Sequence, residues 1–245
     1  MSISTPEGAA PALAPWLQDQ LQSLLSQRGH AWLLSGPSGL GQFELALALA
    51  RAWLCEAPTP QGACGHCGSC HAVDVHTHAD LCMLMPETLF LELGWPLDQK
   101  TQEELDAKKR KPSKEIKVDA AREAVSFTQF TRSRGNTKVV LVFPAERMNA
   151  ITANTLLKTL EEPPGEVKFV LATEATQQLL PTIRSRWLFF SAWLMAMPAG
   201  RAMTRSALRE SMPGKTSPQC GMLFWQFLWP KAGSREHQHP RGGCP

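Results

Sequence analysis

The sequence lacks long apolar segments and a large charge excess. No stretch of eighteen consecutive apolar residues occurs, so no membrane span is expected. The segment from Met1 to Pro15 carries Glu7 but no Lys or Arg, which argues against a secretory signal. A net charge of only +3 gives no electrostatic reason for the whole chain to bind nucleic acid. These absences predict a cytoplasmic protein with no membrane partner.

A second absence lies in a phosphate-binding loop. The motif G-x-x-x-x-G-K-[ST] needs a Lys for the phosphates and a hydroxyl for Mg²⁺. Gly36 and Gly41 stand at the required spacing with Gly39 between them, but Gln42 and Phe43 replace the two chemical residues. Gln has no charge to offset a triphosphate, and a phenyl ring cannot ligate a hard cation. The loop therefore predicts a nucleotide-binding fold that has lost hydrolysis, with no bound ATP.

The surroundings of this loop fit a P-loop origin. An apolar run, His30–Ser35, has the length of a strand, and an Ala/Leu-rich segment, Phe43–Cys55, reads as a buried helix. Strand, Gly-rich turn and helix is the order that the motif requires. An ordinary Gly-rich turn between strand and helix is the alternative interpretation.

Further apolar runs indicate a parallel sheet. They are near-continuous, as expected of strands covered on both faces, and comprise Leu81–Met85, Lys138–Phe143 and Lys168–Ala172. Helices are expected over Asp119–Thr131 and Ala145–Leu160, the second ending before Pro163 and Pro164. This alternation predicts an α/β fold, a three-layer sandwich.

The strand over Lys138–Phe143 also lacks a feature of active ATPases. Acids that hold Mg²⁺ and polarise water are expected at its end, but Phe143 and Pro144 stand there. Glu146 lies past the strand end, and we interpret it as an acid that complements a helix dipole. Both metal-handling positions are thus empty.

Four cysteines have the spacing of a metal site. Cys55, Cys64, Cys67 and Cys70 follow the pattern C-x8-C-x2-C-x2-C, with glycines that permit tight turns. Four thiolates suit a closed tetrahedral zinc site, which is structural because no coordination position stays open. One of four nearby histidines could take the place of one cysteine as a metal ligand: His66, His71, His76 or His78. Free thiols are the alternative, while Cys82 reads as a buried core thiol.

Two segments stand apart from this pattern. Residues 98–115 include Lys108-Lys109-Arg110-Lys111 and form a charged insertion, read as a solvated loop or short exposed helix, with a contact to DNA phosphate as the alternative. Residues 187–245 contain no Val, Ile, Asp or Asn but hold four of the eight Trp. This composition indicates an atypical tail, disordered or translated out of frame.

An eleven-residue segment, Asn154–Pro164, resembles the N-x-L-L-K-x-L-E-E-P-P signature of bacterial clamp-loader AAA+ subunits. The segment Leu179–Arg186 resembles the stretch leading into their S-R-C motif, although Trp187 replaces the Cys. A four-cysteine module after the P-loop helix is shared with that family. Degenerate phosphate and metal motifs are typical of one branch, the delta prime subunits of DNA polymerase III. The resemblance runs from about Leu13 to Arg186.

The resemblance implies a noncatalytic role inside a polymerase holoenzyme that is a DNA-directed nucleotidyltransferase. Expected partners are the ATPase subunits and the clamp-opening subunit of a hetero-oligomeric ring, and through it the sliding clamp and primer-template DNA. Arg186 would reach the ATP of the adjacent subunit as a trans arginine finger. Thr173 matches the sensor position. The roles of Lys158, Glu161 and Glu162 stay open between structure and contacts with DNA or a neighbour.

Other interpretations remain beside this one. The resemblance places an AAA+ module over residues 1–186, with a zinc insertion at 55–70, and the tail at 187–245 does not match the helical lid and collar of the family. An active motor NTPase would need an amine at position 42. A free-standing nucleic-acid-binding zinc module would need Lys or Arg around the cysteines, and residues 55–80 have none. A truncated or frameshifted product is the last alternative.

Overall fold

The structure is a computed structural model that describes residues 13–135, 137–184 and 188–191, with side chains up to residue 183. The chain divides into two compact units, residues 1–199 and 200–245, and everything described here belongs to the first. Apart from the backbone of one short strand, the predictions for residues 187–245 lie outside the described residues. The division of the chain into a module and a tail stays a prediction.

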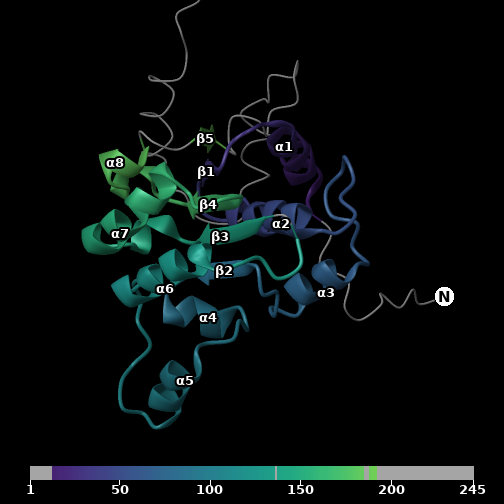
Figure 1. The fold of residues 1–245 in the computed structure, drawn as a ribbon. Coiled ribbons are helices and arrows are strands. Elements are labelled where there is room, and N and C mark those ends of the chain that lie inside the picture. Colours follow the sequence, from purple (N-terminus) through teal and green to yellow (C-terminus); the bar gives the residue numbers. More distant parts are fainter. Residues whose placement is uncertain (1–12, 136, 185–187, 192–245) are drawn as a thin grey trace, which may run out of the picture. The chain divides into compact units, whose positions relative to one another are not determined.

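A five-stranded parallel sheet forms the centre of the first unit (Figure 1). Its strands are β1 (Ala31–Ser35), β2 (Leu81–Leu84), β3 (Lys138–Val142), β4 (Val167–Thr173) and β5 (Leu188–Ser191). They lie in the order β2-β3-β4-β1-β5. The predicted α/β fold with a parallel sheet is confirmed. The four apolar runs read from the sequence became β1 to β4, with ends that differ by a residue or two.

Helices connect these strands. They are α1 (Pro15–Ser26), α2 (Gln42–Leu54), α3 (Gly68–Asp74), α4 (Glu87–Glu92), α5 (Gln99–Asp106), α6 (Val118–Gln129), α7 (Ala150–Glu161) and α8 (Pro181–Arg184), with 3₁₀ turns η1 (Ala145–Arg147) and η2 (Thr176–Gln178). None of the described helices is long and apolar enough to cross a lipid bilayer.

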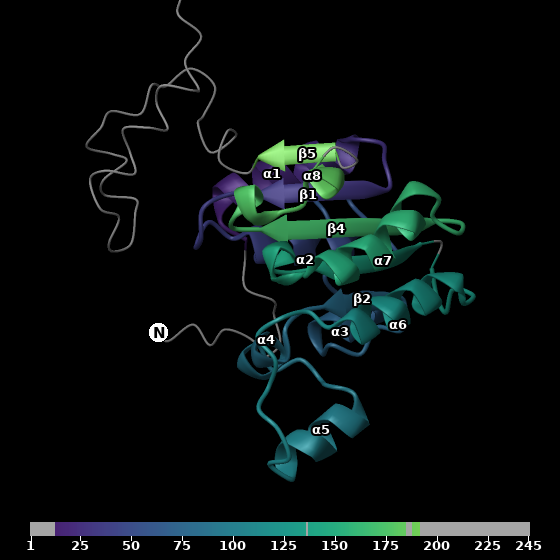
Figure 2. The same ribbon diagram turned by 90° about the vertical axis from the view of Figure 1, so that its left-hand side faces the viewer.

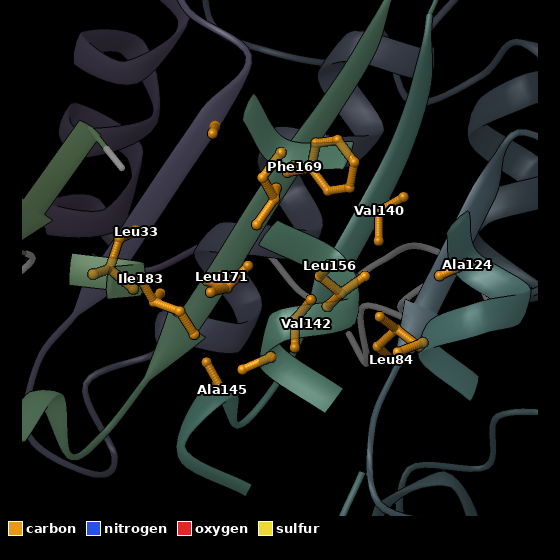
Figure 3. Close-up of a cluster of buried hydrophobic side chains, with 14 of the residues drawn as sticks. Leu33, Leu84, Ala124, Val140, Val142, Ala145, Leu156, Phe169, Leu171 and Ile183 are labelled. Atoms are coloured by element: carbon orange, nitrogen blue, oxygen red, sulfur yellow. The ribbon is translucent and has the colours of Figure 1, made fainter. Parts of the chain in front are cut away.

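The alternation of side chains along the strands builds two cores, one on each face of the sheet. On one face, Leu33, Val140 and Phe169 pack with residues of α6 and α7, and Figure 3 shows this cluster. On the other face, Leu34 and Leu141 pack with leucines of α1 and α2. In Figure 1, α6 and α7 lie to the left of the strands, and α1 and α2 lie to the right. The chain therefore has helices on both faces of the sheet.

The helix predicted over Ala145–Leu160 is interrupted. Residues 145–147 form the 3₁₀ turn η1, and α7 begins afresh at Ala150. Asn149 caps α7, because its side chain accepts a hydrogen bond from Thr152 N at 2.9 Å. A capping Asn inside an apparently continuous helical pattern is the local signal for this break.

The charged insertion contains the short exposed helix that the sequence indicated. Helix α5 buries none of its residues and lies away from the sheet in Figure 2. The loop after it is held by Glu87 of α4, whose carboxylate accepts hydrogen bonds from Arg110 Nη2 at 3.0 Å and Ser113 N at 2.8 Å. Lys117 Nζ lies 2.6 Å from the same carboxylate. One member of the basic run, Arg110, is therefore committed to an internal ion pair.

Candidate functional site

The degenerate P-loop follows β1 at the carboxyl edge of the sheet, where ligands of open α/β sheets bind. Gly36 N donates to Thr173 O of the neighbouring strand at 3.3 Å. Gly41 caps α2 with a φ of 89°, and a Cβ there would lie 2.6 Å from Leu17 Cδ1. Both the left-handed backbone and this contact require glycine. The frame of the phosphate loop is therefore retained in three dimensions.

Gln42 closes this loop from inside. Its side chain is 2 % exposed, and its Nε2 donates to Gly36 O at 2.5 Å and to Pro37 O at 2.6 Å. An amide that donates to the carbonyls of its own loop fills the space near the loop backbone and supplies no charge. The residue at the position of the motif's Lys thus binds its own loop, and both of its side-chain donor contacts are to loop carbonyls.

The two positions that should hold Mg²⁺ are in contact with each other. The rings of Phe43, at the start of α2, and Phe143, after β3, have centroids 5.1 Å apart with an interplanar angle of 33°. Tilted rings at this distance attract each other. Both rings pack against the core that covers the α1/α2 face. An apolar pair therefore stands where an active enzyme needs oxygen ligands.

Glu44 is a residue of this site that sequence reasoning missed. It lies in the first turn of α2, and its Oε2 is 3.5 Å from the Cβ position of Gly41. The N-terminus of a helix favours an anion, and here the protein supplies its own carboxylate. A phosphate at this helix end would meet that negative charge. The acid two residues after Gln42 was the sequence signal for this effect.

The predicted sensor residue is buried and paired. Thr173, at the end of β4, is fully buried, and its Oγ1 donates to Glu146 Oε2 at 2.7 Å. Ala175 N in turn donates to Thr173 Oγ1 at 3.2 Å. Glu146, which the sequence suggests as a helix N-terminal acid, lies in the first turn of the three-residue 3₁₀ helix η1, and its carboxylate accepts the hydrogen bond from Thr173. The pair joins the loops that follow β3 and β4.

The four predicted cysteines converge into one cluster. Their sulfur atoms all lie within 4.8 Å of one another. Cys55 Sγ and Cys67 Sγ are 3.8 Å apart, and Cys64 Sγ and Cys70 Sγ are 4.0 Å apart. A tetrahedral zinc ion with sulfur ligands at its usual bond length places them about 3.8 Å apart. The donor set and its spacing therefore fit zinc.

The surroundings of the sulfurs favour thiolates at part of the cluster. At Cys67, burial acts to raise the pKa, but backbone N–H donors, including Cys70 N at 3.4 Å, outweigh it and bring the pKa to about 6. Burial raises the pKa of Cys70 to about 12. A bound dication would favour the thiolate form of all four, and it would supply a cross-link that holds the module together.

Neighbouring contacts brace this module against α2. Arg51 Nη2 pairs with Asp74 Oδ2 at 2.6 Å, and Glu56 Oε1 accepts from Ser69 N at 3.0 Å. None of the described histidines joins the sulfur cluster. His76 instead stacks on Trp95 with centroids 3.8 Å apart. Cys82 packs against the α6/α7 core, and burial raises its pKa to about 12.

Arg186 and Trp187 lie outside the described residues, so the finger assignment stays a prediction. The segment that precedes them is anchored, because Leu179 and Ile183 are 4 % and 2 % exposed and belong to the α6/α7 core. Lys158 lies on the exposed side of α7, and Glu162 is exposed just after that helix, while the apolar signature residues face inward.

The family model described as "DNA polymerase III, delta subunit" matches residues 12–192. The chain is 39 % identical over 175 residues to "DNA polymerase III subunit delta'" of Pseudomonas aeruginosa, covering 70 % of this chain and 46 % of the relative. Its identity to the protein of the same name from Escherichia coli is 36 % over 177 residues, with the same coverage of 70 % and 46 %. The chain thus spans about half the length of these curated relatives.

More distant similarities follow. The chain is 34 % identical over 161 residues to "DNA polymerase III subunit tau" of Salmonella typhimurium, covering 66 % of this chain and 21 % of the relative. A crystal structure of a DNA polymerase III gamma subunit-related protein from Thermotoga maritima superimposes with a TM-score of 0.48 at 23 % identity, over 72 % of this chain and 45 % of that one. The resemblance read from the signature is confirmed by the family model and the sequence relatives. This chain belongs to the DNA polymerase III delta subunit family, and the relatives reported first are delta prime subunits.

Proposed function

We propose that this chain is a noncatalytic clamp-loader subunit of the DNA polymerase III holoenzyme. It serves as a scaffold in the hetero-oligomeric ring of ATPase and clamp-opening subunits that loads the sliding clamp on primer-template DNA. The observation that carries the noncatalytic assignment is the closed P-loop, in which Gln42 bonds to Gly36 O and Pro37 O. Family membership supports the complex, and the loop supports the silent role within it.

Each chemical step of ATP hydrolysis lacks its group in this chain. No Lys reaches the β- and γ-phosphates, the Phe43–Phe143 pair replaces the Mg²⁺ ligands, and Glu44 opposes an anion at the α2 N-terminus. Phosphoryl transfer depends almost wholly on positioning and charge stabilisation, so the loss of these groups abolishes it. The missing Lys, the Phe43–Phe143 pair and Glu44 also disfavour the alternative of an active motor NTPase.

In this proposal, the chain acts on a neighbour's ATP through Arg186. A guanidinium is always charged and donates in a planar fork, so it can stabilise charge on a phosphoryl group held by another subunit. Support comes from the segment before it, since Leu179 and Ile183 anchor that segment to the core. The cysteine cluster has a separate, structural role as a zinc site.

Isothermal titration of the purified chain with ATP and Mg²⁺ tests the noncatalytic role. We expect no heat of binding at micromolar concentrations and no release of phosphate. The Gln42→Lys variant should still show no turnover, because the Mg²⁺ ligands remain absent. Micromolar binding by the wild type that is lost on replacing Gly41 by Ala would overturn the proposal and favour an active nucleotide site.

A further inference from the structure

A cavity lies at the opposite edge of the sheet from the P-loop. It has a volume of about 420 Å³, and the first residues of the parallel strands β3 and β4, Lys138 and Val167, line it. The end of α6 and the residues after it, 128–132, form one wall, and the turn 164–166 forms the other. Its size falls within the range of small-ligand sites. No step of the proposed function uses it.

Lys138 is a nearly buried lysine in the lining of this cavity. The residue is only 3 % exposed, and no ion pair joins it to a carboxylate in the described part of the chain. Its Nζ donates to Phe127 O at 2.7 Å and lies 4.2 Å from the centroid of the Phe127 ring. This hydrogen bond to a carbonyl near the end of α6 uses one of the three N–H donors of the ammonium group. A buried cation that forms no ion pair among the described residues favours an incoming anion.

An exposed aromatic ring stands among the mostly polar residues at the rim of the cavity. Phe130 lines the cavity, yet its side chain is 70 % exposed, the largest exposure among the exposed large hydrophobic residues that the structure describes. Pro164 lies on the facing wall. An exposed aromatic ring beside a pocket is a common anchor for a partner's apolar side chain. The cavity thus combines a nearly buried positive charge with one exposed aromatic ring.

We infer that this cavity is a docking site for a polypeptide partner that presents a carboxylate beside an apolar side chain. The carboxylate would enter and bind the Lys138 ammonium, and the apolar side chain would pack on Phe130. A carboxylate is small enough to reach a nearly buried Lys, and charge-assisted hydrogen bonds are the stronger ones.

A nucleic acid fits this cavity less well. Backbone binding needs a track of cations along a groove, whereas the cavity has Lys138 within it and Arg132 at its wall. Glu166 also lines the cavity, and its carboxylate would repel a phosphate dianion more strongly than a single carboxylate. The inference stands apart from the nucleotide site and from the clamp-loader role, so its failure would leave both untouched.

The test is a titration of the full chain followed by amide NMR, with N-acetyl-phenylalanine as the probe. This molecule carries one carboxylate and one aromatic ring. We expect the amides of residues 128–132 and 165–167 to shift with a dissociation constant on the order of 1 mM, as suits so small a ligand. The matched probe, N-acetyl-phenylalanine amide, lacks the charge and should bind about tenfold more weakly.

Two variants and one control locate the effect. Phe130→Ala and Lys138→Met should each weaken binding of the acid by about fivefold or more. Ile151→Ala is the control, because Ile151 is 66 % exposed at the far end of α7 and should change nothing. If Lys138→Met fails to fold, the contrast between acid and amide and the Phe130→Ala variant decide the question. Equal binding of acid and amide, shifts elsewhere only, or tighter binding of thymidine 5′-monophosphate would overturn the inference.

Discussion

At the scale of single residues, the loop after β1 is held by side-chain contacts within the protein itself. Phe43 and Phe143 lie far apart in the sequence, yet their rings meet at 5.1 Å. Gln42 satisfies loop carbonyls that would otherwise need water. Such contacts let the loop keep its shape with no ligand, since the protein itself fills the space.

The aromatic pair should be measurable as a coupling energy. Phe43→Leu and Phe143→Leu should each lower the free energy of unfolding, and the double variant should lose less than the sum, with a coupling of about 0.5–1.5 kcal/mol. Urea unfolding of the wild type, the two single variants and the double variant measures this coupling energy in a double-mutant cycle. Phe43→Leu combined with Phe90→Leu in α4 is the additive control. A coupling near zero in the first cycle would mean that the rings do not stabilise each other.

Glu87 gives a residue-level prediction with a defined pH range. Burial acts to raise its pKa, but hydrogen bonds from Arg110, Lys117 and Ser113 N outweigh burial and hold the pKa at about 2, below the ordinary 4.5. The ionised carboxylate therefore stabilises the folded state above pH 4.5, and this contribution is lost as the pH falls toward 2. The free energy of unfolding of the wild type should fall more steeply over that interval than that of Glu87→Gln.

Acid titrations of the unfolding free energy, by chemical denaturation at each pH, check this slope. Glu103→Gln is the matched control, because Glu103 is an exposed acid of the neighbouring helix α5 and should leave the slope unchanged. Glu87→Gln should also cost about 1–3 kcal/mol at neutral pH, since it leaves Arg110 and Ser113 N with a weaker acceptor. Parallel pH profiles for wild type and Glu87→Gln would show that the ion pair contributes nothing.

At the scale of elements, the four cysteines lie in the short segment that runs from the end of α2 into α3. Residues between α2 and α3 contain few apolar side chains, so burial alone supplies little stability to this segment. The Arg51–Asp74 ion pair and the Glu56–Ser69 hydrogen bonds fix its two ends to each other. A zinc ion among the four sulfurs would supply the remaining constraint.

The purified chain should carry a single zinc ion, and Cys67→Ser should release it. Elemental analysis measures the metal, and hydrogen exchange should then show faster exchange over residues 55–75 with β3 and β4 protected as before. Cys82→Ala is the control, because Cys82 lies outside the cluster and its loss should leave the metal bound. A chain that is free of zinc after purification without chelators, or unchanged exchange in Cys67→Ser, would contradict the structural zinc site.

At the scale of the whole molecule, contacts between loops and core side chains fix the positions of the segments at the carboxyl edge of the sheet. The Thr173–Glu146 pair links the ends of β3 and β4, and the core side chains Leu179 and Ile183 hold the segment that leads toward Arg186. A rigid edge of this kind suits a subunit whose contribution to chemistry lies across an interface.

Arg186→Ala should lower the clamp- and DNA-stimulated ATP hydrolysis of a reconstituted loader that contains this chain. A trans arginine can supply about 10³-fold or more, but several subunits share the work, so a smaller loss is expected. Assembly of the loader and the melting temperature of this subunit should stay near wild type. Arg184→Ala, two residues earlier, is the matched control. Full ATPase and loading rates in Arg186→Ala would make the arginine a structural residue only.

Local sequence patterns were enough to predict much of the fold and part of the candidate site. The apolar runs of β1 to β4 and the cysteine spacing each depend on neighbours in the chain, so the sequence alone predicted the parallel α/β fold and the four-cysteine cluster. It also predicted the loss of the Lys and of the metal ligands, because an absent side chain can be read without coordinates. Helix α1 and strand β5 were not predicted, although Leu17, Leu21 and Leu24 carry the helical spacing.

Only the tertiary structure decided which side chains from distant segments meet. The Phe43–Phe143 contact, the Thr173–Glu146 pair and the Lys138 cavity each join segments that the sheet order brings together, and that order places β4 between β1 and β3. Glu146 illustrates the limit, because its position near a helix start suggested a dipole partner, whereas its true partner lies at the end of another strand. Sequence determines which groups exist and their local conformation, while long-range packing selects which of them meet.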